Sequence, residues 1–260
     1  MIRRITKFIV GLIFVVLVAG CHHNKVNNPI ANVDSKQPDK VLFDRAMDAM
    51  KKGKYDVARI TLQTLINTYP DSEFIARAKL AVGDSWYAEG TTASYQQAEV
   101  EYKDFITFFP QLPEAAEAQL KIANMHYKQM EKPDRDQQKT REALDKFNDM
   151  INSYPRSALT PQAVKRRQDV LDRLAKHDHI VARYYIKRHS WNAAVSRLNS
   201  VVERYPDYAD RAGVFYDLGN SLSGLGRKAE ARLYYERVIS EFPKSDYAGH
   251  AKRKLDQLKA

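Results

Sequence analysis

The chain has 260 residues and carries 42 lysines and arginines against 32 aspartates and glutamates, a net charge of +10. Its single cysteine excludes a disulfide bond within the chain. The sequence contains no phosphate-binding loop, serine elbow or HExxH motif, and its acidic residues are scattered among basic ones, as on a solvated helical surface. We therefore predict that the protein is not an enzyme and has no catalytic residues, metal site or cofactor.

Residues 1–20 are predicted to be a secretory signal. A basic start precedes an apolar run over residues 8–20, which is too short for a membrane span. The sequence VAGC at 18–21 resembles the bacterial lipobox, in which the cysteine is lipidated and becomes the first mature residue. The alternative is a plain signal peptide followed by a chance cysteine. We favour a covalent lipid on Cys21, because an odd thiol in an exported protein needs an explanation.

Residues 21–38 are predicted to be the lipidated cysteine and a flexible tether, because they contain few large apolar residues and show no helical period. The tether would reach about 60 Å when fully extended and roughly 20–25 Å as a random coil. Its His22 and His23 could bind a metal, but we interpret them as polar linker residues. We expect no nucleic-acid partner for an exported chain, so the positive charge suits an acidic protein surface, anionic headgroups or solvent.

The segment after the tether repeats one phrase. INTYPDS at 66–72 returns as INSYPRS at 151–157, and three looser copies also place an aromatic residue directly before a proline. Proline disfavours helix in the residue before it, so each copy predicts the end of a helix. An alanine lies twelve residues before each proline, with larger apolar residues eight and five before it, all on one helical face. The alanines are Ala58, Ala98, Ala143, Ala194 and Ala231.

A second helix with a small residue at a close crossing precedes each of these helices, as Ala46, Ala182 and Gly219 indicate. The spacing resembles the tetratricopeptide (TPR) repeat, with insertions at 91–93 and 131–138. Five such units can bury a continuous core where one cannot. We therefore predict an all-α protein, a right-handed α-solenoid of five TPR helical hairpins plus a C-terminal capping helix. An ordinary helical bundle with accidental matches is the alternative.

Residues 160–189 contain no glycine, and their only proline, Pro161, lies near the start behind Thr160. This arrangement predicts one helix of nearly thirty residues with Thr160 at its N-cap. We expect this helix to connect N-terminal repeats one to three, residues 39–158, to a C-terminal part. The C-terminal part, residues 159–260, would hold the long helix, repeats four and five, and the capping helix.

Several phrases between residues 134 and 207 resemble the BamD family, the TPR lipoproteins of the β-barrel assembly machine in Gram-negative outer membranes. The phrases are DRDQQKTREALDKFNDMINSYPRS, DRLAKH, VARYY, RHSW, AAVSR and RYPD. The likeness is specific there and extends generically over the mature chain. Residue 22 is histidine, not the aspartate that tends to retain enterobacterial lipoproteins at the inner membrane. The resemblance therefore implies a lipid anchor at the periplasmic face of the outer membrane.

The resemblance also implies partners. Members of the family are not enzymes; they dock the barrel subunit BamA through C-terminal repeats and bind C-terminal signals of unfolded outer-membrane proteins. By its place in AAVSR, Arg197 is expected to contact a periplasmic POTRA domain of BamA, with Arg188 nearby. The alternative for Arg197 is a surface ion pair with Glu203 or Asp207. Other Bam lipoproteins are expected partners where the organism has them.

In the TPR pattern, certain positions of each first helix point into a concave groove. A groove with aromatic residues, methionines and a few polar groups suits an extended peptide, although packing between repeats is the alternative for each residue. The predicted groove residues are Phe43, Met47 and Met50 in repeat one, Asp84 and Tyr87 in repeat two, and Asn124 and Tyr127 in repeat three. The rival function is another periplasmic TPR adaptor, such as a Tol–Pal or peptidoglycan-synthesis coordinator, and an envelope enzyme would need a catalytic cluster that the sequence lacks.

Overall fold

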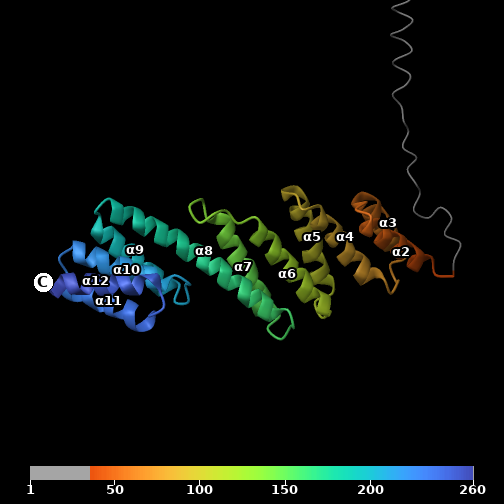
Figure 1. Cartoon of the computed structure of the whole chain (residues 1–260). Coiled ribbons are helices and arrows are strands. Elements are labelled where there is room, and N and C mark those ends of the chain that lie inside the picture. The colour runs from red at the N-terminus through yellow and green to blue at the C-terminus, as the bar shows by residue number, and fades with distance from the viewer. Residues whose placement is uncertain (1–35, 260) are drawn as a thin grey trace, which may run out of the picture. The chain divides into compact units, whose positions relative to one another are not determined.

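The computed structural model describes residues 36–259, so the predicted signal, Cys21 and most of the predicted tether lie outside the described residues. These residues form two compact units, 36–75 and 76–259, in which every regular element is an α-helix (Figure 1). The helices are α2 (Pro38–Lys51), α3 (Tyr55–Thr68), α4 (Ile75–Glu89), α5 (Thr92–Phe108), α6 (Pro113–Lys128), α7 (Gln138–Ser153), α8 (Thr160–Lys187), α9 (Trp191–Arg204), α10 (Arg211–Gly224), α11 (Lys228–Glu241) and α12 (Asp246–Lys259).

Consecutive helices pair into five hairpins, from α2 with α3 to α10 with α11, and α12 packs on α11 as a final helix. The prediction of an all-α fold built from TPR-type hairpins with a capping helix is confirmed over the described residues. Helix α2 begins at Pro38, one residue before the predicted start of repeat one. The predicted division of the repeats at residues 158 and 159 stays a prediction.

The aligned apolar positions of the five second helices form the core. Every one of these side chains is at most 1% exposed, which confirms that they share one buried face. The positions twelve residues before each proline are the five alanines. The larger residues are Leu62, Tyr102, Phe147, Leu198 and Tyr235, followed by Leu65, Phe105, Met150, Val201 and Val238.

The close crossings within the hairpins follow a rule of size. Where the second helix carries a tyrosine, the first helix carries a glycine, because a Cβ on Gly83 would lie 2.7 Å from Cε1 of Tyr102. A Cβ on Gly219 would lie 2.5 Å from Cε1 of Tyr235. The other three hairpins place a buried alanine at the first position and leucine or phenylalanine at the second. These pairs are Ala46 with Leu62, Ala123 with Phe147 and Ala182 with Leu198.

Each second helix ends two residues before its proline, as predicted. The intervening C-cap residue has φ between −128° and −131° in all five hairpins, outside the helical region that proline disfavours for its predecessor. These C-caps are Tyr69, Phe109, Tyr154, Tyr205 and Phe242. Five identical helix ends explain why the phrase recurs in the sequence.

The two insertions are accommodated differently. The insertion at 91–93 lengthens α5 to 17 residues, against 14 for α3, and Thr91 caps its start in a capping box with Ser94. The insertion near 131–138 forms the loop between α6 and α7. The buried Gln137 fixes this loop, because its Nε2 donates to the carbonyl oxygens of Lys132 at 2.8 Å and Arg135 at 2.9 Å.

Helix α8 is a single helix of 28 residues, as predicted. Its N-cap is Leu159 rather than Thr160, so the predicted cap is wrong by one residue. The Thr160 hydroxyl instead donates to the carbonyl oxygen of Tyr154 at 2.5 Å and ties the start of α8 to the end of α7. The first half of α8 packs with α7 through Ala163 and Val170, and its second half packs with α9 and α10.

Candidate partner-binding surfaces

The predicted groove residues of repeat one are only partly accessible. Phe43 is 4% exposed and stacks on Phe74 with ring centroids 5.2 Å apart, so it is a packing residue and the prediction that it lines an open groove is wrong. Met47 and Met50 are half-buried on the same helix, α2. Together they present a small apolar surface whose flexible thioether side chains can adapt to a peptide.

Asp84 of α4 is held by two donors. The Tyr102 hydroxyl donates to Asp84 Oδ1 at 2.6 Å, and Lys121 Nζ of α6 donates to the same oxygen at 2.6 Å. Lys121 also pairs with Glu117 at 2.7 Å. Burial, followed by the Asp84 charge, raises the pKa of Tyr102, so its hydroxyl stays protonated and remains a donor. Asp84 therefore joins the second hairpin to the third and is not a free carboxylate.

The aromatic groove residues are covered by cations. Lys128 Nζ lies 4.4 Å above the Tyr87 ring, and Tyr87 in turn packs 5.8 Å from Tyr95. Arg166 of α8 lies 5.4 Å above the Tyr127 ring. Each contact leaves a half-buried ring with a positive charge over one face.

Asn124 completes this row, because its Oδ1 accepts a hydrogen bond from Arg166 Nη1 at 2.6 Å. The structure thus brings together the predicted residues of α4 and α6 and adds Lys121, Lys128 and Arg166. The sequence pattern did not single out these three cations. Lys121 lies three residues before Asn124 and Lys128 four after it, so helical spacing alone could have found two of them. The surface is cationic and aromatic, which suits a peptide that carries a carboxylate.

Arg197 of α9 pairs with a residue that the sequence did not suggest. Its Nη1 lies 3.5 Å from Asp178 Oδ1, so the expected alternative partners Glu203 and Asp207 are wrong. Asp178 receives its shorter contact, 2.6 Å, from Arg204. The Arg197 side chain is 40% exposed. Because Arg204 makes the shorter contact with the buried Asp178, that carboxylate does not depend on Arg197 alone for its charge partner.

A cavity of about 270 Å³ opens beside Arg197 between α7, α8 and α9. Three guanidinium groups and one imidazole meet a single carboxylate there, so positive charge is in excess. Burial raises the pKa of Tyr205 in its wall, which keeps that hydroxyl neutral. The lining residues are Arg141, Leu174, His177, Asp178, Arg197, Arg204 and Tyr205.

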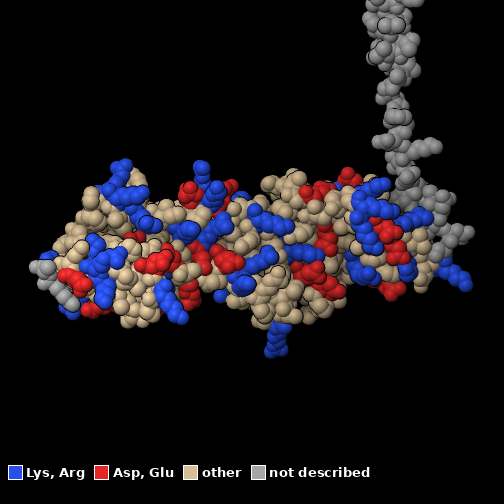
Figure 2. Space-filling view, viewed as in Figure 1, with Lys and Arg blue, Asp and Glu red and all other residues tan. Residues whose placement is uncertain are grey.

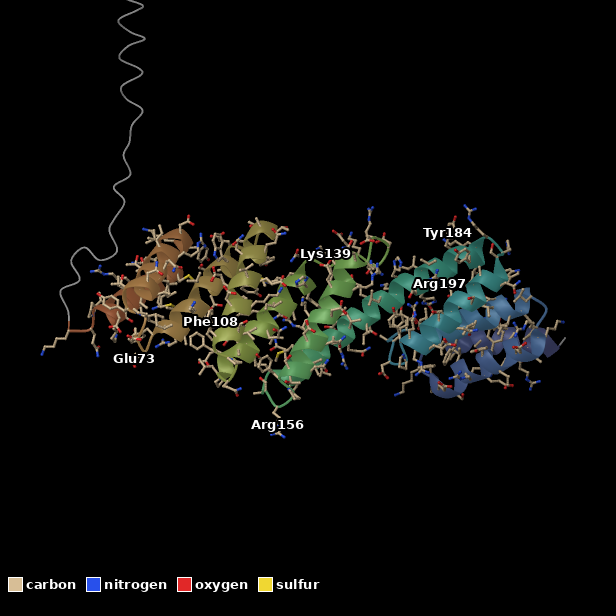
Figure 3. All side chains as sticks on the ribbon, turned by 180° about the vertical axis from the view of Figure 1, so that it is seen from behind. Glu73, Phe108, Lys139, Arg156, Tyr184 and Arg197 are labelled. Carbon is tan, nitrogen blue, oxygen red and sulfur yellow. The ribbon has the colours of Figure 1, made fainter. Side chains whose placement is uncertain are left out.

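Arg188 lies apart from this cavity. It is the C-cap of α8, and its guanidinium carbon stacks 4.7 Å over the Tyr184 ring, which is 51% exposed. Figure 3 labels Tyr184 and Arg197 on the neighbouring helices α8 and α9. The structure therefore offers Arg188 and Tyr184 as one exposed pair and Arg197 as part of a separate recess.

The face shown in Figure 2 mixes charges of both signs, with lysines and arginines interspersed among aspartates and glutamates. Over residues 36–259, no helix is long and apolar enough to cross a membrane. In the same part of the chain, no group of three or more histidine, cysteine, aspartate or glutamate residues is arranged to hold a metal ion.

The sequence model of one family, described as outer membrane lipoprotein and named YfiO, matches residues 35–233. The chain belongs to this family. The matched span begins before α2 and ends inside α11, so membership does not depend only on the phrases between residues 134 and 207.

Several proteins that are similar to this chain are named outer membrane protein assembly factor BamD. The one from Rickettsia prowazekii (strain Madrid E) is 25% identical over 251 residues, which cover 96% of this chain and 97% of the relative. The one from Xylella fastidiosa (strain 9a5c) is 25% identical over 233 residues, covering 83% and 75%. These relatives confirm the resemblance to the BamD family that the sequence phrases indicated. The family is one of assembly factors and not of enzymes, as predicted.

Among solved structures, the chain resembles the TPR2AB domain of yeast Sti1, solved as a complex with pHSP90, at a TM-score of 0.44 and 13% identity. That likeness covers 86% of this chain and 98% of the domain. A thermophilic TPR protein from Thermus thermophilus is similar at a TM-score of 0.34 and 14% identity, covering 85% and 98%. Both are helical-repeat proteins.

Proposed function

We propose that this YfiO-family protein is a lipid-anchored component of the β-barrel assembly machine, held at the periplasmic face of the outer membrane by a lipid on Cys21. The observation that carries the proposal is the family match over residues 35–233, together with relatives named as outer membrane protein assembly factors. A protein built from helical hairpins offers several separate surfaces, which is what an adaptor needs.

In this proposal the C-terminal repeats dock a periplasmic POTRA domain of BamA through Arg197, and Arg188 contacts a neighbouring part of the same partner. The support is chemical. The Arg197 side chain is 40% exposed at the edge of a recess with excess positive charge, and Arg188 stacks on the exposed ring of Tyr184. Both groups suit carboxylates on a partner protein. Other Bam lipoproteins would use surfaces that these residues leave free.

The N-terminal repeats would bind C-terminal signals of unfolded outer-membrane proteins. The half-buried Met47 and Met50 would do so in the first unit, and the row formed by Asp84, Tyr87, Asn124 and Tyr127 in the second. The cations over this row favour a peptide with a carboxylate, and the rings favour its apolar side chains.

The test is co-purification of the full chain, carrying Cys21→Ser and a tag, with the periplasmic region of BamA. Arg197→Glu and Arg197→Gln would run beside Arg232→Glu, a matched control at an exposed arginine of α11. We expect retention of BamA by the parent and the control and loss of retention with both Arg197 variants, each checked for folding by circular dichroism. Retention by every variant would keep the function and move the docking site. No retention by the folded parent would favour the Tol–Pal-type adaptor.

A further inference from the structure

The five turns that follow the hairpins share one backbone geometry. In each, the carbonyl oxygen of the residue before proline accepts a hydrogen bond from the backbone N–H two residues after proline, at 3.0 to 3.2 Å. The acceptors are Tyr69, Phe109, Tyr154, Tyr205 and Phe242, and the donors are Ser72, Leu112, Ser157, Tyr208 and Ser245. Differences between the turns therefore lie in their side chains.

Three of the turns carry a serine and then a large apolar residue. The serine Oγ accepts from the backbone N–H of that residue at 3.1 to 3.2 Å, and the apolar side chain packs inward. Phe74 stacks on Phe43, and Tyr247 packs 5.4 Å from Tyr216. Leu159 packs against the core between α7 and α8. In these turns the apolar side chain fills the space under the turn.

The turn between α5 and α6 departs from that pattern. Leu112 replaces the serine and Glu114 replaces the apolar residue. The turn between α9 and α10 makes the same exchange, but its Tyr208 is only 6% exposed, whereas Leu112 is 37% exposed. The shorter leucine does not fill the space that an aromatic side chain occupies in the related turn.

An open cleft of about 680 Å³ lies at this place, which we name the turn cleft. It runs between the α5–α6 turn and the α7–α8 turn. Its lining residues are Pro110, Gln111, Leu112, Pro113, Glu114, Ala116, Glu117, Ser153, Tyr154, Pro155, Arg156, Ser157, Ala158 and Leu159. Most of its accessible surface is apolar, and burial raises the pKa of the Tyr154 phenol in its wall, which keeps that group neutral.

The rims of the turn cleft carry charges of opposite sign. Glu114 and Glu117 lie on the α6 side, where Glu117 pairs with Lys121 at 2.7 Å. Arg156 projects from the α7–α8 turn on the other side (Figure 3). Within residues 36–259, neither Glu114 nor Arg156 has an ion pair. An occupant that carried a cation at one end and an anion at the other would match both rims.

We propose that the turn cleft binds an extended peptide segment of a partner protein, which inserts one large aromatic side chain between the two turns. A basic residue on one side of that aromatic would meet Glu114, and an acidic residue on the other side would meet Arg156. The aromatic replaces the inward-packing side chain that the α5–α6 turn lacks. This site is distinct from the row of Asp84, Tyr87, Asn124 and Tyr127, and the proposal holds whether or not Arg197 docks BamA.

The probe is a fluorescein-labelled peptide of ten residues in which glycine and serine flank a lysine, a central phenylalanine and a glutamate. Its binding to the full chain carrying Cys21→Ser would be measured by fluorescence anisotropy. We expect replacement of the phenylalanine by alanine to weaken binding by about tenfold or more, because an aromatic side chain then leaves an apolar site. Exchange of the lysine and glutamate positions should weaken it less.

Two variants of the chain test whether the peptide lies in the turn cleft. Leu112→Asp places a charge in the cleft wall at a half-exposed position, and we expect it to weaken binding about tenfold. Glu114→Phe restores the residue type found at Phe74, and we expect it to fill the cleft and abolish binding while the chain stays folded. Val100→Asp, on the exposed face of α5 outside the cleft, is the matched control and should leave binding unchanged.

Several results would overturn the proposal. One is the absence of peptide binding at millimolar concentration by the folded chain, and another is binding that survives both Leu112→Asp and Glu114→Phe. Self-association of the chain that Leu112→Asp abolishes would make a second copy the occupant. Peptide binding that appears only after deletion of residues 22–35 would make the chain's own N-terminal segment the occupant.

Discussion

Two regions of the molecule use the same parts with different chemistry. The inner contact is made by hairpin two and its junction with hairpin three, and the outer contact by hairpin five and its junction with hairpin four. Each has a glycine beneath a tyrosine and a histidine between two carboxylates. At the inner contact Tyr102 donates to Asp84, and at the outer contact Tyr235 donates to Asn220 at 2.9 Å. The charged acceptor recruits Lys121 from the next hairpin, whereas the neutral one serves its own hairpin.

The histidines of the two contacts differ in their distances to the carboxylates and in their exposure to solvent. His126 lies 3.0 Å from Glu99 and 3.5 Å from Glu142, with its side chain 13% exposed. His179 lies 2.9 Å from Asp217 and 3.9 Å from Asp210, with its side chain 4% exposed. The histidine of the inner contact is thus more open to solvent, and the acceptor of its tyrosine is charged where that of the outer contact is neutral. A repeat can therefore keep its backbone while only the polarity of its contacts with neighbouring hairpins changes.

The largest expected effect comes from breaking the glycine–tyrosine fit at either contact. Gly83→Ala and Gly219→Ala should each lower the free energy of unfolding by about 1–3 kcal/mol, because the new methyl group overlaps a buried ring. Urea denaturation of each variant measures the loss. If only one glycine were sensitive, the two contacts would not be built alike.

In a matched control, the effect of Gly83→Ala on the free energy of unfolding should change sign. With Tyr102→Leu as background, Gly83→Ala should no longer destabilise and should raise helix stability by up to about 1 kcal/mol. Hairpins one and four already pair alanine with leucine at these positions. A double-mutant cycle in which the two changes were additive would contradict the size rule.

The next effect is specific to the inner contact and depends on pH. The hydrogen bond from His126 lowers the pKa of Glu99 to about 2 from an ordinary value of 4.5. A lowered pKa stabilises the fold fully above pH 4.5, and that stabilisation is lost as the pH falls from 4.5 toward 2. We expect a loss of roughly 1–2 kcal/mol from this group.

Urea midpoints measured between pH 6 and pH 2 would show this loss in the parent chain. Glu99→Gln should flatten the dependence, whereas Glu236→Gln, an exposed glutamate of α11, should leave it unchanged. If the urea midpoint fell equally with pH in all three proteins, Glu99 would not be the source of the pH dependence.

The smallest expected loss of stability comes from making the acceptor of Tyr102 neutral, like the acceptor of Tyr235. Asp84→Asn keeps an acceptor for Tyr102 but removes the ion pair with Lys121, so it should cost about 1 kcal/mol. Lys121→Met should cost a similar amount, and the double variant should cost less than the sum. Additive losses would show that Asp84 and Lys121 do not act as a pair.

Much of the fold was predictable because its signals are local. The period of the buried residues, the proline after each second helix and the absence of breakers in α8 all act within one or two helical turns. Contacts between helices were harder to foresee. The sequence did not indicate that Asp178, on the preceding helix, pairs with Arg197, or that Phe74 covers Phe43, because such contacts depend on crossing geometry.

The predicted groove shows the same limit. The TPR pattern pointed to residues on α4 and α6, but it did not reveal that Asp84 and Asn124 have intramolecular partners, Lys121 and Arg166. The turn cleft also escaped prediction, since it depends on the absence of one apolar side chain at Glu114. The missing side chain can be recognised only when the α5–α6 turn is compared with the four other turns, which share its backbone hydrogen bond.

Helix α8 has a mechanical consequence. Its 28 residues span about 42 Å at 1.5 Å per residue, twice the length of α9 with 14. One end is fastened to α7 and the other to α9 and α10, with Pro161 in the first turn and no glycine between. The helix is therefore stiff along its whole length, so a displacement of α9 and α10 would be carried through it to α7.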